Sequence, residues 1–295
     1  MPTPIIEFRH VSHAYGTGSE RTEVLHDINL TIHEGEFLAI VGFTGSGKTT
    51  LVNMMTGLLR PSEGEVLYRG EPITGPAPER GIIFQNYSLL PWYTVCENVA
   101  LSVEQVYPDW DGERVREHVL RFVEMVNLTP ALEKRPGELS GGMRQRVSIA
   151  RVLATDPDLL LMDEPLGALD ALTRGNLQEE ILNIWSANRR TAVLITNDID
   201  EGVYMADRMI PLDPPTDRGA TLGPELNIFL DRPRDKTALN TDAHFQDVRT
   251  QLLNHLVALG EASRGKRRDD LRLPDLEPVL PASRRGFRRM FREAA

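Results

Sequence analysis

The sequence predicts an α/β fold, and three stretches of the chain support that prediction. Residues 38–41 form a short apolar run with strand character, followed by a glycine-rich loop and an apolar-periodic segment at residues 51–58. Residues 159–163 and 192–196 are two further apolar runs of strand length, with a helical pattern between them at residues 177–185. Strands that alternate with helices are typical of a parallel sheet, whose carboxyl-terminal strand ends gather ligands at one edge.

The first of these stretches, LAIVGFTGSGKTT at residues 38–50, fits the phosphate-binding loop pattern G-x-x-x-x-G-K-[ST]. Glycines let backbone N–H groups approach a polyphosphate, and the helix N-terminus adds partial positive charge. Lys48 is expected to reach the β- and γ-phosphates, and the Thr49 hydroxyl to hold Mg²⁺. A chance glycine-rich turn is the alternative, but it does not explain a strand before the loop and a helix after it. We therefore expect a nucleotide site that includes Gly42, Thr44, Gly45, Ser46, Gly47, Lys48, Thr49 and Thr50.

Composition limits the class of protein. The 295 residues can form one large core or two modest ones, and Cys96 is the only cysteine, which excludes an internal disulfide and favours a reducing compartment. No signal-peptide pattern opens the chain, and no apolar run approaches 18 residues. We therefore expect a soluble, cytosolic protein that docks at a membrane if it works there.

Charge is unevenly distributed along the chain. The formal net charge is -10, yet residues 264–295 carry ten Lys/Arg against five Asp/Glu. The net charge of residues 1–263 is therefore about −15. Such an acidic surface argues against nucleic acid as a partner.

The N-terminal part, residues 5–41, reads as strand-rich, and residues 65–68 and 82–84 predict two more strands. Tyr15 stands beside a predicted turn and has two readings from its context alone, a strand residue or an aromatic that contacts a ligand. Gln85 is a polar residue at the predicted end of the strand 82–84, where a strand edge meets a ligand. Residues 114–127 have helical spacing with one apolar face.

A second predicted anion site lies at residues 139–146, LSGGMRQR. Ser140 is placed to cap the helix that follows, which leaves backbone donors at Gly141 and Gly142 open to an anion.

Two carboxylates end the buried strand at residues 159–163. Asp163 is placed to hold a metal through water, and Glu164 to polarise an attacking water. The structural alternative is a pair of acids that cap a helix. The strand at residues 192–196 ends at Asn197, and an Ala-Leu-Asp loop closes with Asp170.

Together these motifs resemble the ATP-binding subunit of ABC transporters over about residues 5–230, because they occur in that family's order with plausible spacing. The resemblance implies an α/β P-loop NTPase fold, with a RecA-like core, a small antiparallel β subdomain and an α-helical subdomain around residues 88–150. It also implies two such domains that sandwich two ATP molecules with Mg²⁺.

The resemblance assigns roles to the individual residues. Tyr15 becomes the adenine-stacking aromatic, and Gln85 connects the nucleotide to the membrane partner. Ser140, Gly141 and Gly142 contact the γ-phosphate of the ATP held by the opposite subunit, and Asp170 lies at the dimer seam. The resemblance makes Glu164, Asn197 and Gln85 the catalytic residues. It makes Thr49, Gln85 and Asp163 the residues that bind the metal ion.

One position departs from the family pattern. Most such ATPases carry histidine where this chain has Asn197. An amide donates a hydrogen bond but carries no positive charge and moves no proton, so we expect slower hydrolysis than in a histidine variant.

The residues after this position narrow the resemblance to the nitrate/bicarbonate branch of the nitrate–sulfonate–taurine importers. The matching stretches are residues 196–201, 207–212, 219–224 and 232–240, whereas residues 78–81 are similar across that whole importer group. The implied function is ATP-driven import of nitrate or a related inorganic anion such as nitrite, cyanate or bicarbonate. The implied partners are transmembrane permease subunits, a second ATP-binding subunit (identical or a paralogue) and, indirectly, a periplasmic anion-binding protein. The implied location is peripheral, at the cytoplasmic face of the bacterial inner membrane.

Three alternatives stay open from sequence alone. The first is a sulfonate or taurine importer, and the second is a soluble ABC ATPase of DNA repair or translation. The second lacks support because the chain has neither a long coiled coil nor two cassettes. The third is a regulatory subunit with weak hydrolysis, which the intact Glu164 argues against.

We divide the chain into an ABC ATP-binding domain at residues 1–230, an extension at residues 231–260 that packs on it, and a linker with a basic tail at residues 261–295. Phe287, Met290 and Phe291 lie at helical spacing among arginines. This tail is either a basic amphipathic helix on anionic lipid or a solvated terminus.

Overall fold

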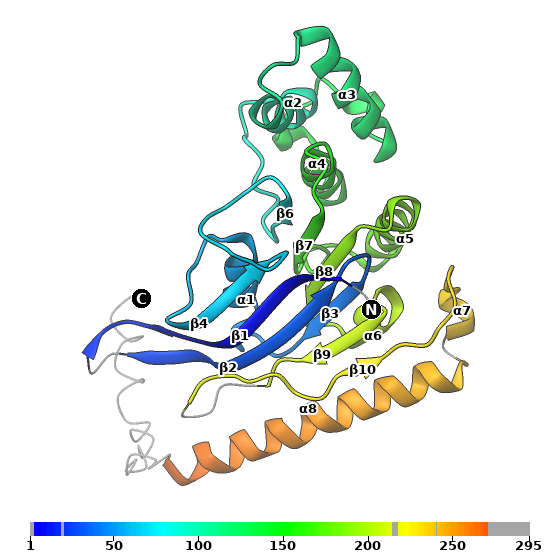
Figure 1. Ribbon diagram of the computed structural model, residues 1–295. Coiled ribbons are helices and arrows are strands. Elements are labelled where there is room, and N and C mark those ends of the chain that lie inside the picture. The colour runs from blue at the N-terminus through cyan, green and yellow to red at the C-terminus, as the bar shows by residue number, and fades with distance from the viewer. Residues whose placement is uncertain (1–2, 19–20, 214–217, 240, 271–295) are drawn as a thin grey trace, which may run out of the picture. The chain divides into compact units, whose positions relative to one another are not determined.

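The computed structural model describes residues 3–18, 21–213, 218–239 and 241–270. Its larger sheet has six strands in the order β10-β9-β3-β8-β7-β6 (Figure 1). The strands are β3 (Phe37–Val41), β6 (Arg80–Ile83), β7 (Leu159–Asp163), β8 (Thr191–Thr196), β9 (Arg208–Pro211) and β10 (Leu226–Asn227). All neighbours pair in parallel except β10 with β9. The predicted α/β fold with a parallel sheet is confirmed.

The central strands are apolar throughout because the sheet is covered on both faces. Successive side chains of β3 enter two separate cores, Phe37, Ala39 and Val41 on one side and Leu38 and Ile40 on the other. All residues of β3, β7 and β8 are buried. This two-sided burial explains why the three segments read as continuous apolar runs.

A second sheet is antiparallel and has the order β2-β1-β4-β5. It consists of β1 (Pro4–Tyr15), β2 (Thr22–His33), β4 (Glu63–Tyr68) and β5 (Glu71–Pro72). Its buried residues Ile5, Ile6, Phe8 and Val66 belong to the same core as Leu38 and Ile40 of β3. This sheet is the antiparallel β subdomain that the resemblance implied.

The helices α1 (Lys48–Thr56), α5 (Ala171–Asn188) and α6 (Ile199–Met205) belong to the part built on the large sheet. The helices α2 (Val95–Val106), α3 (Gly112–Met125) and α4 (Gly141–Leu153) pack together in a helical part above it (Figure 1). The resemblance implied a helical subdomain here, but α2 itself was not predicted. Its signal is a capping box, in which Thr94 accepts a bond from the backbone N–H of Glu97 and Glu97 accepts one from that of Thr94.

The segment that follows β9 returns to the large sheet through residues as far as Leu256. It contains β10, α7 (Lys236–Leu239) and α8 (Ala243–Asp270), and its buried residues Leu239, Phe245, Val248 and Leu252 join the core that contains Phe37. The helix continues through residues 261–270, where the sequence analysis placed a linker. Proline is absent from this stretch and first appears at Pro274, so nothing breaks the helix there. The tail at residues 283–295 lies outside the described residues.

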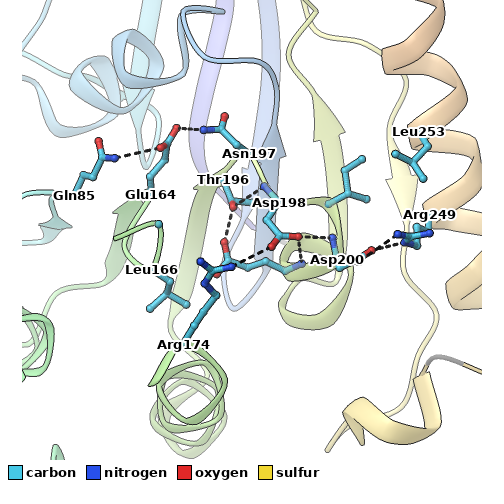
Figure 2. A pocket seen from close by; sticks show the side chains of 13 residues that line it. Gln85, Glu164, Leu166, Arg174, Thr196, Asn197, Asp198, Asp200, Arg249 and Leu253 are labelled. Atoms are coloured by element: carbon cyan, nitrogen blue, oxygen red, sulfur yellow. Dashed lines mark hydrogen bonds and ion pairs between the residues drawn. The ribbon is translucent and has the colours of Figure 1, made fainter. Parts of the chain in front are cut away.

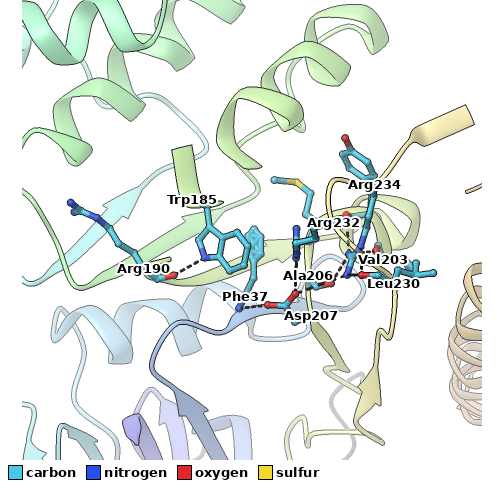
Figure 3. Close-up of polar contacts among 11 residues, drawn as sticks. Phe37, Trp185, Arg190, Val203, Ala206, Asp207, Leu230, Arg232 and Arg234 are labelled. Atoms are coloured by element: carbon cyan, nitrogen blue, oxygen red, sulfur yellow. Dashed lines mark hydrogen bonds and ion pairs between the residues drawn. The ribbon is translucent and has the colours of Figure 1, made fainter. Parts of the chain in front are cut away.

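Two arginines fasten this C-terminal segment to the end of α6 (Figure 3). Arg234 donates to the carbonyls of Val203 and Tyr204 at 2.9 Å and of Ala206 at 2.7 Å, which lie in the last turn of α6 and beyond it. Carbonyls at a helix end lack intrahelical donors, and the buried guanidinium supplies them. Burial lowers the pKa of Arg234 to about 10, still high enough to keep the side chain charged near neutral pH. Arg232 pairs with Asp207 at 2.8 Å.

No helix among the described residues is long and apolar enough to cross a membrane.

Candidate functional site

The register of the large sheet brings three polar segments together at one edge. Val41 of β3 pairs with Thr196 of β8, and Asp163 of β7 pairs with Ile195. The segments that follow these strands begin with Gly42, Glu164 and Asn197, so the parallel strands deliver all three to the same end of the sheet.

Glycines in the phosphate loop are required by its backbone. Gly45 and Gly47 have φ angles of 84° and 98°, in the left-handed region that favours glycine. A Cβ on Gly42 would lie 2.7 Å from the Leu212 carbonyl oxygen, so no larger residue fits there. The loop lines a hollow of about 460 Å³ with residues of the predicted nucleotide site.

Lys48 lies almost fully buried inside this loop, with 4% of its surface exposed. Its ammonium group donates to the Gly42 and Phe43 carbonyls at 2.9 Å and to Asn197 Oδ1 at 2.7 Å. Burial lowers the pKa of Lys48, and the nearby charge of Glu164 opposes that shift. The Ser46 hydroxyl beside it is buried without a hydrogen-bond partner, which leaves a donor available within the loop.

Glu164 sits at the centre of the polar edge (Figure 2). Its carboxylate accepts from Asn197 Nδ2 at 2.8 Å and from Gln85 Nε2 at 3.4 Å, and it lies 3.6 Å from Lys48 Nζ. Its φ of 46° is unusual for a residue with a side chain, a strained conformation of the kind that clusters at functional sites. The structure therefore brings together the three predicted catalytic residues. Gln85 lies two residues beyond the end of β6 rather than directly at the strand end.

Asp163 and Thr49 face each other across the same edge. The Thr49 hydroxyl donates to Asp163 Oδ2 at 3.0 Å. Burial raises the pKa of Asp163, while the bond from Thr49 and the charge of Lys48 lower it.

Oxygen donors of this kind fit Mg²⁺, which keeps water or phosphate oxygens in its remaining positions. No group of three or more His, Cys, Asp or Glu side chains among the described residues could hold a metal ion by itself.

Tyr15 ends β1, and 46% of its surface is exposed. Its hydroxyl lies 3.4 Å from Thr50 Oγ1 of α1, and the ring meets His13 edge-on at 4.7 Å. The aromatic face is therefore held beside the phosphate loop.

The predicted second anion site lies elsewhere in the chain. Ser140 caps α4 by accepting from the Met143 backbone N–H at 3.3 Å. The hollow lined by Ser140 and Gly142 shares no residue with the hollow at the phosphate loop. Asp170 caps α5, and the backbone bond from Thr173 lowers its pKa. One chain thus does not bring these residues to its own phosphate loop.

A polar network behind Asn197 was missed by the sequence analysis as part of the site. The buried Glu201 of α6 accepts from Thr196 Oγ1 at 2.5 Å and from Gln178 Nε2 of α5 at 3.1 Å. It adjoins a cavity of about 550 Å³ that also includes Glu164 and Asn197. The only signal in the sequence was that Glu201 is an acidic residue four positions after Asn197. The fold shows that its side chain points into the protein.

The glycine loop at a helix N-terminus, the buried lysine, the Thr49–Asp163 pair and the nearby Glu164 define a phosphate-binding site of the P-loop nucleoside triphosphatase class. Comparisons with known proteins agree with this. The family model described as "ABC transporter" matches residues 25–167.

The chain is also similar to individual proteins. It is 42% identical to the nitrate import ATP-binding protein NrtD of Synechococcus elongatus, over 86% of this chain and 92% of that protein. It is 44% identical to the nitrate transport protein NasD of Klebsiella oxytoca, over 86% of this chain and 96% of that protein. The bicarbonate transport ATP-binding protein CmpD of Synechocystis is 42% identical, over 86% and 89%.

Among solved structures, the dimeric bacterial ABC transporter cassette MJ0796 is similar, with a TM-score of 0.69 and 32% identity. It matches 77% of this chain and 100% of that chain. A post-hydrolysis form of the same cassette, bound to ADP and phosphate, matches with a TM-score of 0.69 and 31% identity. The chain belongs to the family of ABC transporter ATP-binding proteins, and it is an ATPase of that family.

Proposed function

We propose that this chain is the ATP-hydrolysing subunit of an ABC importer that drives uptake of nitrate or a related inorganic anion such as bicarbonate. The observation that carries the hydrolytic part is the position of Glu164, oriented by Asn197 and Gln85 beside the phosphate loop. The anion rests on similarity to nitrate and bicarbonate import proteins.

Each residue has a role that its contacts support. Lys48 and the loop N–H groups bind the β- and γ-phosphates of ATP, and the half-exposed Tyr15 ring stacks on the adenine. The Glu164 carboxylate orients and polarises the water that attacks the γ-phosphate. Thr49, Asp163 and Gln85 would hold Mg²⁺, which neutralises charge on the phosphates when bound.

The separation of Ser140 from the phosphate loop supports a dimer. We propose that Ser140, Gly141 and Gly142 contact the γ-phosphate of the ATP held by a second ATP-binding subunit, with Asp170 at the seam. The remaining partners are permease subunits in the membrane and, indirectly, a periplasmic anion-binding protein. The chain then works peripherally at the cytoplasmic face of the inner membrane.

Nitrate uptake by intact cells at limiting external nitrate tests the proposal, comparing wild type with Glu164→Gln. The variant keeps the size of the side chain but removes the base, so ATP hydrolysis should fall about a hundredfold or more. We expect nitrate uptake to be lost, with normal protein level and normal taurine uptake. Unchanged nitrate uptake with loss of bicarbonate or taurine uptake would contradict nitrate as the substrate, whereas unchanged hydrolysis would contradict the role of Glu164.

A further inference from the structure

We propose that Glu201 is a positioning residue for hydrolysis, which fixes the loop around Asn197 through the hydroxyl of Thr196. This inference rests on the proposed function, because it assumes that the Asn197–Glu164 contact is part of the ATPase site. The geometry behind it is a buried carboxylate aimed at the strand end that carries Asn197.

Glu201 is 5% exposed and is not among the residues that line the hollow at the phosphate loop. Its two oxygens accept from different elements, one from Thr196 at the end of β8 and one from Gln178 of α5. Burying a carboxylate costs free energy unless its oxygens are bonded, so this arrangement must hold both donors in place. Glu201 thereby connects α5 and α6 to the last residue of β8.

The Thr196 hydroxyl passes this constraint to the loop. It donates its hydrogen to Glu201 at 2.5 Å and accepts from the Asp198 backbone N–H at 3.0 Å. These two bonds fix the residues on both sides of Asn197. Asp198 is held further because its carboxylate caps α6, accepting from the N–H groups of Asp200 and Glu201 at 3.0 and 3.2 Å.

The position of the Asn197 amide depends on that constraint. It donates to Glu164 at 2.8 Å and accepts from Lys48 at 2.7 Å, so a small displacement of the loop changes both contacts. A misplacement of this kind lowers the rate of the chemical step, whereas the phosphate loop that binds ATP stays intact.

Two substitutions break the connection at different points. Glu201→Gln keeps the shape but cannot accept from both Thr196 and Gln178, since one amide nitrogen now replaces an acceptor. Thr196→Val removes the hydroxyl, and Thr196→Ser restores it. Glu179→Gln is the matched control, because Glu179 is an exposed carboxylate one position along α5 from Gln178 and pairs with Lys236 instead.

We expect kcat for ATP to fall about tenfold in Glu201→Gln and in Thr196→Val, with KM and ATP binding unchanged. Thr196→Ser and Glu179→Gln should hydrolyse ATP at the wild-type rate. The double variant that combines Glu201→Gln with Thr196→Val should be no slower than either single variant. In an Asn197→Ala background, Glu201→Gln should not lower kcat further.

The assay uses the purified full chain, with unfolding midpoints measured in parallel. A further loss of kcat from Glu201→Gln in the Asn197→Ala background would overturn the proposal, since it would show an effect that bypasses Asn197. An unchanged kcat in both Glu201→Gln and Thr196→Val would overturn it as well. If the wild-type chain hydrolysed no ATP, the proposed function would fail instead.

Discussion

Two helices of this protein begin at glycine-containing loops, yet their N-termini are built in opposite ways. The N-terminus of α1 is closed by its own chain, because the buried Lys48 lies across the loop and bonds Asn197. The N-terminus of α4 carries the exposed Ser140 as its cap. The residues that line the hollow beside it include Lys134 but no carboxylate. Figure 1 shows the two helices in different parts of the fold. The phosphate loop at α1 is therefore closed by groups of its own chain, whereas we propose that the N-terminus of α4 is half of a site completed by a second subunit.

The largest expected effect is at the closed loop. Lys48→Ala removes the only lysine in that hollow, so it should lower kcat/KM for ATP about a hundredfold or more, through loss of charge-assisted bonds to phosphate. Measured nucleotide affinity should fall as well. Arg60→Ala, an exposed change just after α1, is the control, and wild-type affinity in Lys48→Ala would contradict the assignment of the cradle.

The open N-terminus should respond differently. Gly141→Asp places a carboxylate at the start of α4. The helix dipole stabilises a negative charge there, but the carboxylate would repel the γ-phosphate of ATP held by a second subunit. We expect ATP binding to be retained and hydrolysis to be lost, with a smaller loss in the neutral Gly141→Asn.

Mixing the two variants sharpens the comparison. An equal mixture of Lys48→Ala and Gly141→Asp should recover about a quarter of the wild-type rate, because half of randomly formed dimers contain one intact composite site. Each variant alone stays inactive. No recovery in the mixture would argue against half-sites that complete each other between subunits.

A moderate effect is expected at Asn197, which borders the closed loop. Asn197→His introduces a side chain that can carry charge and move a proton, so hydrolysis by the assembled complex should rise. Steady-state ATPase rates measure this. An unchanged or lower rate would show that the amide is not what limits hydrolysis.

The smallest effect concerns stability. Burial raises the pKa of Glu201, with Asp198 adding to the shift and Thr196, Gln178 and Arg174 opposing it. The folded state then binds this proton more tightly than the unfolded state, so the contribution of Glu201 is full below its ordinary pKa and is lost as pH rises through the raised value. Relative to Glu201→Gln, wild type should therefore lose unfolding free energy over that pH range. Urea unfolding at a series of pH values tests this, and parallel curves would contradict it.

Much of the fold was readable because its signals are local. The strand before Gly42, the helix after it and the buried runs at residues 159–163 and 192–196 all appear where the sequence places them. The helix α2 was missed, although Thr94 and Glu97 mark its start. Residues 261–270, which the sequence predicted as a linker, are helical because a polar composition does not break a helix in the absence of proline.

The sequence by itself determined the chemistry of the site, because the glycine loop with its lysine and the pair of carboxylates each lie within one short motif. What only the tertiary structure decided is which of these groups meet. Parallel pairing of β3, β8 and β7 brings Lys48, Asn197 and Glu164 within hydrogen-bonding or ion-pair distance, although they are 149 and 33 residues apart along the chain. Burial of α6 likewise turned Glu201 inward beneath Asn197. Such contacts depend on strand order and helix packing, which no short stretch of sequence encodes.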